Sequence, residues 1–184
     1  MRTMETCLSD VKLIEPEVHL DQRGFFFESY NQRAAGSAGI KTEFVQDNFS
    51  HSVQGVLRGL HFQVKQPQAK LVQVLYGKVW DVVVDLRRQS PTYGQWEGFE
   101  LDDQNHRQLF IPPGFAHGFS VLSPTAGFLY KVDRFWAPGD EAGLAYNDPQ
   151  LQIDWKVARP ILNEKDQKLP LLRDLTQFPL LQPA

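Results

Sequence analysis

The spacing of apolar residues along the chain limits its fold class more than any other feature of the sequence. Segments with apolar residues at every third or fourth position, which amphipathic helices require, are nearly absent. Short runs of β-branched and aromatic residues recur instead between glycine, proline and asparagine residues. We therefore expect an all-β fold, a sandwich or jelly-roll barrel that protects its edges by wrapping, with a few short helices.

The clearest strands are residues 70–75 and 79–86, which flank Tyr76-Gly77-Lys78 and predict a β-hairpin. Alternation within 79–86 separates Asp81 and Asp85 from a face made of Trp80, Val82, Val84 and Leu86. Further predicted strands are 24–30, 56–63, 108–111, 118–122 and 127–136. Helices are predicted only at 32–37 and 164–167, and both are short.

Length and composition exclude several classes of protein. A chain of 184 residues has the size of one domain, so residues 1–184 are expected to form a single domain. A formal net charge of -3 without a block of lysine or arginine argues against a nucleic-acid partner. No apolar run approaches the ~18–20 residues that cross a bilayer, so no membrane partner is expected. Cys7 is the only cysteine, which excludes an internal disulfide and fits a reducing, cytoplasmic location.

Two of the five histidines lie in segments that favour a functional role. His61 shares the predicted strand 56–63 with Arg58, and strict alternation would point the two side chains to opposite faces. A bulge at Gly59 would bring them to the same face. His117 follows a stiff turn, Pro112-Pro113-Gly114, which would hold its side chain in place. A hydrogen-bonded structural role is the alternative for both histidines.

Both histidines lie in segments that resemble cupin motifs. Pro112-x-Gly114-x-x-His117 resembles the second cupin motif, and Gly59-x-His61-x-Gln63 resembles part of the first. The resemblance implies a cupin-type jelly roll. In metal-binding cupins a second histidine and a glutamate complete the ligand set, but here Gln63 and Lys70 stand at or near those positions. A protonated lysine repels a cation, so no metal is expected.

A closer resemblance runs from about Arg23 to Asp166, and it is to the dTDP-4-dehydrorhamnose 3,5-epimerase family. The matching stretches are Asp21-x-Arg23-Gly24-x-Phe26-x-Glu28, Phe44-Val45-Gln46-Asp47-Asn48-x-Ser50, Gly55-Val56-Leu57-Arg58-Gly59-Leu60-His61-x-Gln63, Gln68-x-Lys70-Leu71-Val72, Asp81-Val82-x-Val84-Asp85-Leu86-Arg87, Ile111-Pro112-x-Gly114-x-x-His117-Gly118-Phe119, Tyr130-Lys131, Asn147-Asp148-Pro149 and Glu164-Lys165-Asp166.

The resemblance implies a reaction on a dTDP-linked 4-keto-6-deoxyhexose in which C3 and C5 are both inverted, a step of dTDP-L-rhamnose biosynthesis. Both carbons adjoin the C4 ketone, so removing either proton gives an enolate and requires no cofactor. A base with a pKa near neutrality suits that step, and the motif assigns it to His61. The family supplies an orienting carboxylate from the position of Asp166, although Asp81 or Asp85 could substitute.

The resemblance also assigns the remaining site residues. Tyr130 matches the proton donor on the opposite face, and Lys70 matches the residue beside the C4 oxygen, where a cation stabilises the enolate. Residues implied to bind the nucleotide or sugar are Arg23, Glu28, Gln46, Asn48, Arg58, His117 and Trp136. Alternation along 127–136 would point Tyr130 and Trp136 the same way, so that Trp136 could stack on thymine.

A homodimer is expected because the family's N-terminal stretch reaches into the neighbouring site with the residue matching Arg23. The Phe-rich segment after it, 24–27, is also more apolar than an exposed strand face should be. Rival functions are an epimerase that inverts only C5 or only C3 of a related dTDP-4-keto sugar, and a non-catalytic cupin that binds a nucleotide sugar. A metal-dependent oxygenase is a third rival, disfavoured by Gln63 and Lys70.

Overall fold

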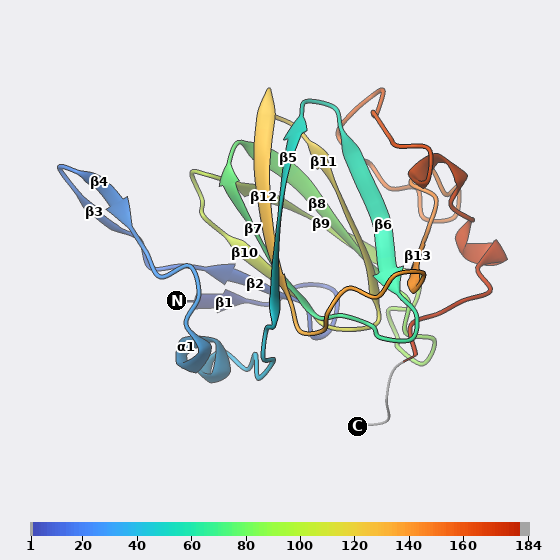
Figure 1. Cartoon of the computed structure of the whole chain (residues 1–184), viewed down its shortest axis with the longest axis horizontal. Coiled ribbons are helices and arrows are strands. Elements are labelled where there is room, and N and C mark those ends of the chain that lie inside the picture. The colour runs from blue at the N-terminus through green and yellow to red at the C-terminus, as the bar shows by residue number, and fades with distance from the viewer. Residues whose placement is uncertain (1, 181–184) are drawn as a thin grey trace.

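The computed structural model describes residues 2–180 and has two antiparallel β-sheets that face each other (Figure 1). The six-stranded sheet has the order β1 (Arg2–Met4), β2 (Lys12–Glu15), β10 (Gln108–Ile111), β7 (Lys70–Tyr76), β12 (Thr125–Val132) and β5 (Gln46–Val53). The five-stranded sheet has the order β13 (Glu141–Gly143), β6 (Leu57–Gln63), β11 (Phe115–Val121), β8 (Lys78–Asp85) and β9 (Trp96–Asp102). This architecture confirms the expected cupin-type jelly roll.

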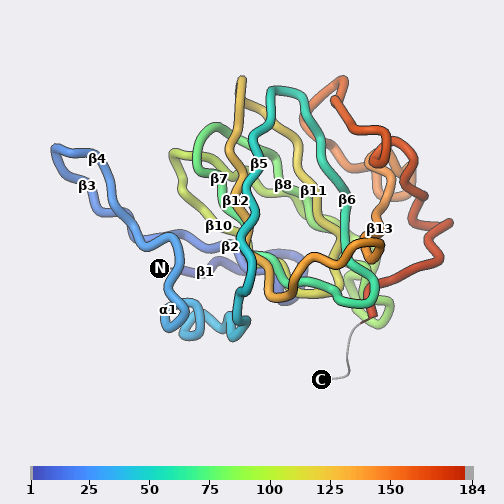
Figure 2. The backbone as a smooth tube through the Cα atoms, viewed as in Figure 1, coloured from blue at the N-terminus to red at the C-terminus, as the bar shows by residue number. Residues whose placement is uncertain are grey.

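Three short elements and one separate hairpin complete the fold. Strands β3 (His19–Asp21) and β4 (Gly24–Phe26) pair only with each other and project away from the two sheets (Figures 1 and 2). Helix α1 (Gln32–Ser37) agrees with the prediction and begins at Asn31, whose side chain accepts two backbone N–H bonds. The 3₁₀ turns are η1 (Asp166–Lys168) and η2 (Leu172–Asp174). Among residues 2–180, no helix is long and apolar enough to span a membrane.

The predicted hairpin of residues 70–75 and 79–86 is wrong in its pairing. Strand β7 pairs with β10 and β12, whereas β8 pairs with β11 and β9 in the other sheet. Gly77 turns the chain between the sheets at φ +80°, and a Cβ there would lie 2.1 Å from the carbonyl oxygen of Thr125. Loop side chains stabilise this turn. Asp103 accepts a hydrogen bond from the backbone N–H of Gly77, and Ser123 accepts one from the backbone N–H of Lys78. Local turn signals cannot reveal such a change of sheet.

Both faces of β8 are buried, in agreement with its nearly continuous apolar sequence. Val79 and Val83 belong to the core between the sheets, and Asp81 and Asp85 lie on this same face of the strand. Val82 and Val84 pack on the outer face under the C-terminal segment, which contributes Trp155 and other apolar side chains. This covering segment, coloured orange to red in Figure 1, brings η1 into contact with strand β6.

Other strand predictions differ from the structure mainly at their ends. Strand β12 stops at Val132, so the predicted strand 127–136 is too long. The next residue, Asp133, accepts a 2.7 Å hydrogen bond from the backbone N–H of Ala69, which turns the chain out of the sheet. Strand β4 covers only Gly24–Phe26 of the predicted 24–30, and η1 replaces the helix predicted near 164–167. The sequence did not predict β5, whose residues are mostly polar and show no apolar alternation.

Candidate active site

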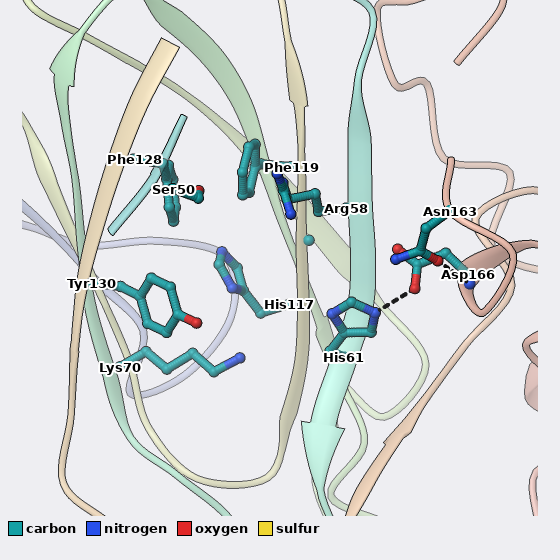
Figure 3. A pocket seen from close by; sticks show the side chains of 11 residues that line it. Ser50, Arg58, His61, Lys70, His117, Phe119, Phe128, Tyr130, Asn163 and Asp166 are labelled. Atoms are coloured by element: carbon teal, nitrogen blue, oxygen red, sulfur yellow. Dashed lines mark hydrogen bonds and ion pairs between the residues drawn. The ribbon is translucent and has the colours of Figure 1, made fainter. Parts of the chain in front are cut away.

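A pocket of about 620 Å³, including the open space at its mouth, lies between the two sheets. Its walls come from β6 and β11 on one side and from β7, β12 and β5 on the other, with the C-terminal segment at one end (Figure 3). The lining residues are Ser50, Arg58, His61, Lys70, His117, Gly118, Phe119, Phe128, Tyr130, Asn163 and Asp166. Six of the eleven residues predicted for the site, namely His61, Lys70, Tyr130, Asp166, Arg58 and His117, therefore line one pocket.

A bulge in β6 places Arg58 and His61 in the same pocket, as the sequence predicted. His61 pairs with His117 and Arg58 pairs with Phe119, so β6 has one more residue than β11 in this interval. Gly59 has φ +107°, and a Cβ there would lie 2.6 Å from the carbonyl oxygen of His117. Only glycine fits this close approach between strands.

Asp166 provides the carboxylate partner of His61. Its Oδ1 lies 2.7 Å from Nε2 of His61, and its Oδ2 accepts a 3.1 Å hydrogen bond from the backbone N–H of Gly59. Burial opposes ionisation of Asp166, but the His61 and Gly59 contacts hold its pKa below the ordinary value. An ionised Asp166 accepts a hydrogen bond from Nε2–H of His61, and in this tautomer the nitrogen on the pocket side, Nδ1, carries no proton (Figure 3).

The two alternative orienting carboxylates are engaged elsewhere. Both oxygens of Asp81 lie within 3.0 Å of Nε2 of His117, and this pair is buried. Asp85 binds Arg87, Ser90 and Thr92 at the end of β8. Neither Asp81 nor Asp85 therefore substitutes for Asp166.

Lys70 and Tyr130 extend into the pocket from the wall opposite His61 (Figure 3). Burial lowers the pKa of Lys70 to about 8, although the negative charges of Asp81 and Glu141 oppose this shift. Burial and the negative charge of Glu141 raise the pKa of Tyr130. Near neutral pH the pocket therefore holds a lysine that is mostly protonated and a phenol that keeps its proton.

Burial lowers the pKa of His117, even though its partner Asp81 favours the charged form. The pKa of Asp81 is in turn raised by burial against the opposing effects of His117 and Lys70. The His117 ring lies in the pocket between His61 and Phe128 (Figure 3). This side chain is therefore anchored from behind by a buried carboxylate.

The pocket-facing residues of β5 continue the site along one strand. Ser52 accepts a 3.1 Å hydrogen bond from Nε of Arg58, and Ser50 lines the pocket. Farther along the same face, Gln46 donates to Asn48 and accepts from the backbone N–H of Trp136. Gln46 and Asn48 thus form a polar row leading away from the pocket.

The side chain of Trp136 does not continue the face of β12 that carries Tyr130, because the strand ends at Val132. Trp136 lies in the following turn, is 55% exposed and does not line the pocket. The prediction that alternation along one strand aligns Tyr130 with Trp136 is therefore wrong. The backbone of Trp136 still adjoins the polar row through Gln46.

Two other predicted residues lie outside the pocket of their own chain. Arg23 is at the turn of the β3–β4 hairpin, where its largely exposed guanidinium binds Asp21. Glu28 accepts a hydrogen bond from Asn31 and lines a second pocket beside α1. The structure of one chain does not bring either residue to His61.

Sequence reasoning missed Ser52, Asn163 and Glu141 as parts of the site. Ser52 binds Arg58, and Asn163 accepts a 2.7 Å hydrogen bond from the backbone N–H of Asp166. Glu141 lies with Oε1 3.5 Å from Nδ1 of His61. The signal for Asn163 is its position three residues before Asp166, which is the spacing of a side-chain cap. Ser52 and Glu141 had no local signal.

The model of the dTDP-4-dehydrorhamnose 3,5-epimerase family matches residues 5–174 of this chain. A Pseudomonas aeruginosa dTDP-4-dehydrorhamnose 3,5-epimerase is 54% identical over 97% of this chain and 100% of its own length. The crystal structure of a Legionella pneumophila 3,5-epimerase in complex with dTDP-4-keto-L-rhamnose has a TM-score of 0.94 and 47% identity, covering 99% of each chain.

A Streptomyces niveus dTDP-4-dehydrorhamnose 3-epimerase is 41% identical over 98% of this chain and 88% of its own length. The family match spans nearly the whole chain, and the pocket between the sheets holds the His61–Asp166 pair opposite Lys70 and Tyr130. The chain therefore belongs to the dTDP-4-dehydrorhamnose 3,5-epimerase family, whose members are isomerases.

Proposed function

We propose that this enzyme inverts C3 and C5 of dTDP-4-dehydro-6-deoxy-D-glucose to give dTDP-4-dehydro-L-rhamnose, a step of dTDP-L-rhamnose biosynthesis. The observation that carries the proposal is the His61–Asp166 pair, which turns an unprotonated ring nitrogen toward Lys70 and Tyr130. A nucleotide-sugar-binding protein without catalytic activity would not require a base and an acid on opposite walls. The family match and the relatives' activities support the same reaction.

His61 is the base in this proposal. Nδ1 takes the proton from C3 or C5, the C–H bond breaks, and the electron pair moves into an enolate whose oxygen is the former C4 carbonyl oxygen. The imidazolium that forms is stabilised by the ionised Asp166 at Nε2. Because both carbons adjoin the same ketone, one base and one enolate-stabilising group serve both inversions.

Lys70 and Tyr130 act on the opposite side of the sugar. A pKa of about 8 leaves the Lys70 ammonium mostly protonated near pH 7, and its charge stabilises the enolate oxygen in a partly dehydrated site. The raised pKa of Tyr130 keeps its hydroxyl protonated, so it can deliver a proton to the face opposite His61. No cofactor takes part, because the ketone of the substrate activates both C–H bonds.

The nucleotide part of the substrate lies along β5 in this proposal. Arg58 is positioned by Ser52 and offers a guanidinium for the diphosphate. The polar row of Gln46 and Asn48 leads from Arg58 toward Trp136, whose exposed indole can stack on thymine. His117, anchored by Asp81, binds the sugar at the centre of the pocket.

We propose that two chains form the active enzyme as a homodimer. Leu20 is 80% exposed and Phe26 is 67% exposed on the β3–β4 hairpin, which projects from the barrel (Figure 1). A second copy would cover these apolar side chains and place Arg23 at the neighbouring site. Glu28 would join the nucleotide-binding residues in the same way. Residues 1–184 act as one domain in this proposal, in the cytoplasm.

The test is NMR of the 4-keto substrate in deuterated water, with C3 and C5 followed separately. We expect deuterium to enter both positions with inversion. The matched control is His61→Asn, which should fold but exchange at least ~10²-fold more slowly because the base is missing. Near wild-type exchange by this variant would contradict the assignment of His61.

A second candidate function is inversion at only one of the two carbons. It is favoured by the 41% identity to the Streptomyces niveus 3-epimerase. Exchange and inversion confined to C3 or to C5 in the same NMR experiment would replace the proposed function with this one.

A further inference from the structure

A second carboxylate lies beside His61, on the side opposite Asp166. Oε1 of Glu141 is 3.5 Å from Nδ1 of His61, and the Glu141 side chain is 27% exposed. Glu141 begins the edge strand β13 and pairs with Gln63, whereas the residue paired with His61 is Gly143. Because Gly143 has no side chain, Glu141 can reach His61 diagonally across the same face.

Lys165 binds the other oxygen of this carboxylate. Its Nζ lies 2.8 Å from Oε2 of Glu141. Lys165 also directly precedes Asp166, which binds Nε2 of His61. Two consecutive residues at the start of η1 therefore act on the two nitrogens of one imidazole, Asp166 directly and Lys165 through its ion pair with Glu141.

The contact between Glu141 and His61 changes its character during proton transfer. While Nδ1 is unprotonated, it and the carboxylate oxygen 3.5 Å away are both acceptors, and no hydrogen bond forms between them. After Nδ1 takes the substrate proton, the ring carries a positive charge beside the same oxygen, and the contact becomes attractive. An interaction that strengthens only as the proton moves lowers the barrier of that step.

We propose that Glu141 and Lys165 are a pair of positioning residues that sets how readily His61 takes a proton. The negative charge of Glu141 favours the protonated ring, and the positive charge of Lys165 offsets part of that effect. This inference rests on the proposed function, because it takes His61 as the base.

Other charged and titratable groups also face His61 from the elements packed around it. These groups are Asp166 from η1, Lys70 from β7, His117 from β11, Tyr130 from β12 and Arg58 from β6 itself. All of them stay in place when only the Glu141–Lys165 pair is altered. Opposite effects of the two single substitutions therefore report on this pair.

The first experiment compares Glu141→Gln with Lys165→Met through the pH dependence of deuterium exchange into the substrate. Glu141→Gln should move the acidic limb of the rate profile about 0.5–1 pH unit lower, because an opposite charge near the base is lost. Lys165→Met should move it about 0.3–0.5 unit higher, a smaller effect because Lys165 is half exposed. Both changes should shrink at high salt.

The matched control is Lys168→Met. Lys168 is an exposed lysine at the end of η1, three residues after Lys165, and forms no ion pair among residues 2–180. Its substitution therefore removes the same charge without touching Glu141. The pH–rate profile of Lys168→Met should match that of the wild-type enzyme. A shift equal to that of Lys165→Met would mean that the net charge of the turn, not the ion pair, sets the profile, and would overturn the proposal.

A second measurement does not depend on catalysis. The His61 ring can be titrated by NMR in substrate-free enzyme, with His61→Asn identifying its signal among the five histidines. We expect the midpoint to fall in Glu141→Gln and rise in Lys165→Met. Unmoved midpoints in folded proteins that still exchange deuterium overturn this inference alone. A wild-type enzyme that exchanges neither substrate proton overturns the proposed function, and this inference with it.

Discussion

Asp166→Asn is the substitution whose effect follows most directly from the geometry around His61. The native carboxylate accepts two hydrogen bonds, from Nε2 of His61 at 2.7 Å and from the backbone N–H of Gly59 at 3.1 Å. An asparagine has only one side-chain oxygen. The backbone N–H of Gly59 can only donate, so the amide oxygen must turn to Gly59 and the NH₂ group must face His61.

The consequence is a change of tautomer in His61. Its Nε2 would have to accept from the amide, so the ring proton would move to Nδ1, the nitrogen that faces the substrate. The base would then be blocked although every atom stays close to its native place. A forced wrong tautomer costs about 10⁴-fold in a catalytic triad, or about 5.4 kcal/mol, and we expect a loss of about 10³–10⁴-fold here.

Asp166→Ala is the informative comparison. It removes the orienting charge but leaves the ring free to choose either tautomer, so we expect a smaller loss in rate, about 10²–10³-fold. It also leaves the buried N–H of Gly59 unsatisfied, at a cost of about 1–3 kcal/mol in the free energy of unfolding. The Asp166→Asn enzyme should thus be slower than the Asp166→Ala enzyme but have the higher free energy of unfolding.

The assay is deuterium exchange at C3 and C5, combined with ¹⁵N NMR of the His61 ring and denaturant unfolding of both variants. The expected signature is a protonated Nδ1 in Asp166→Asn only. An Asp166→Asn enzyme within about 10-fold of wild type, or one slower than wild type with the native tautomer, would refute the reasoning.

Four further predictions follow from the site. Tyr130→Phe should still allow exchange with retention through His61 but slow net inversion about 10²–10⁴-fold, and equal loss of exchange and inversion in a folded protein would contradict a donor role. The rate should fall as pH rises through about 8, because Lys70 loses its charge there, and a flat profile up to pH 10 would exclude this role. Activity should survive exhaustive chelation, because the Lys70 ammonium repels a cation; loss of activity that returns with added metal would overturn this. Light scattering should show a dimer that Leu20→Ser with Phe26→Ser weakens, and a fully active wild-type monomer would disprove the homodimer.

The sequence alone was sufficient for the fold class and for most of the pocket. Alternating and continuous apolar runs predicted β6, β8, β10 and β11, because a strand that is buried must show its burial in its own residues. The bulge at Gly59 was also predictable, since glycine within a strand marks a place where another backbone comes close. Strand β5 was missed because its inner face lines the polar pocket and its outer face is exposed.

The partners of the site residues were decided by the tertiary structure. His61 meets Asp166 across 105 positions of the chain, and His117 meets Asp81 across 36. Periodicity reports only whether a side chain is buried, and both Asp81 and Asp166 are buried, so it could not tell which carboxylate reaches His61. The sheet to which β8 belongs was hidden for the same reason, since strand pairing depends on distant segments. The local pattern of apolar and polar residues determines which side chains are buried. Only the packing of the two sheets and the C-terminal segment determines which buried side chains contact one another.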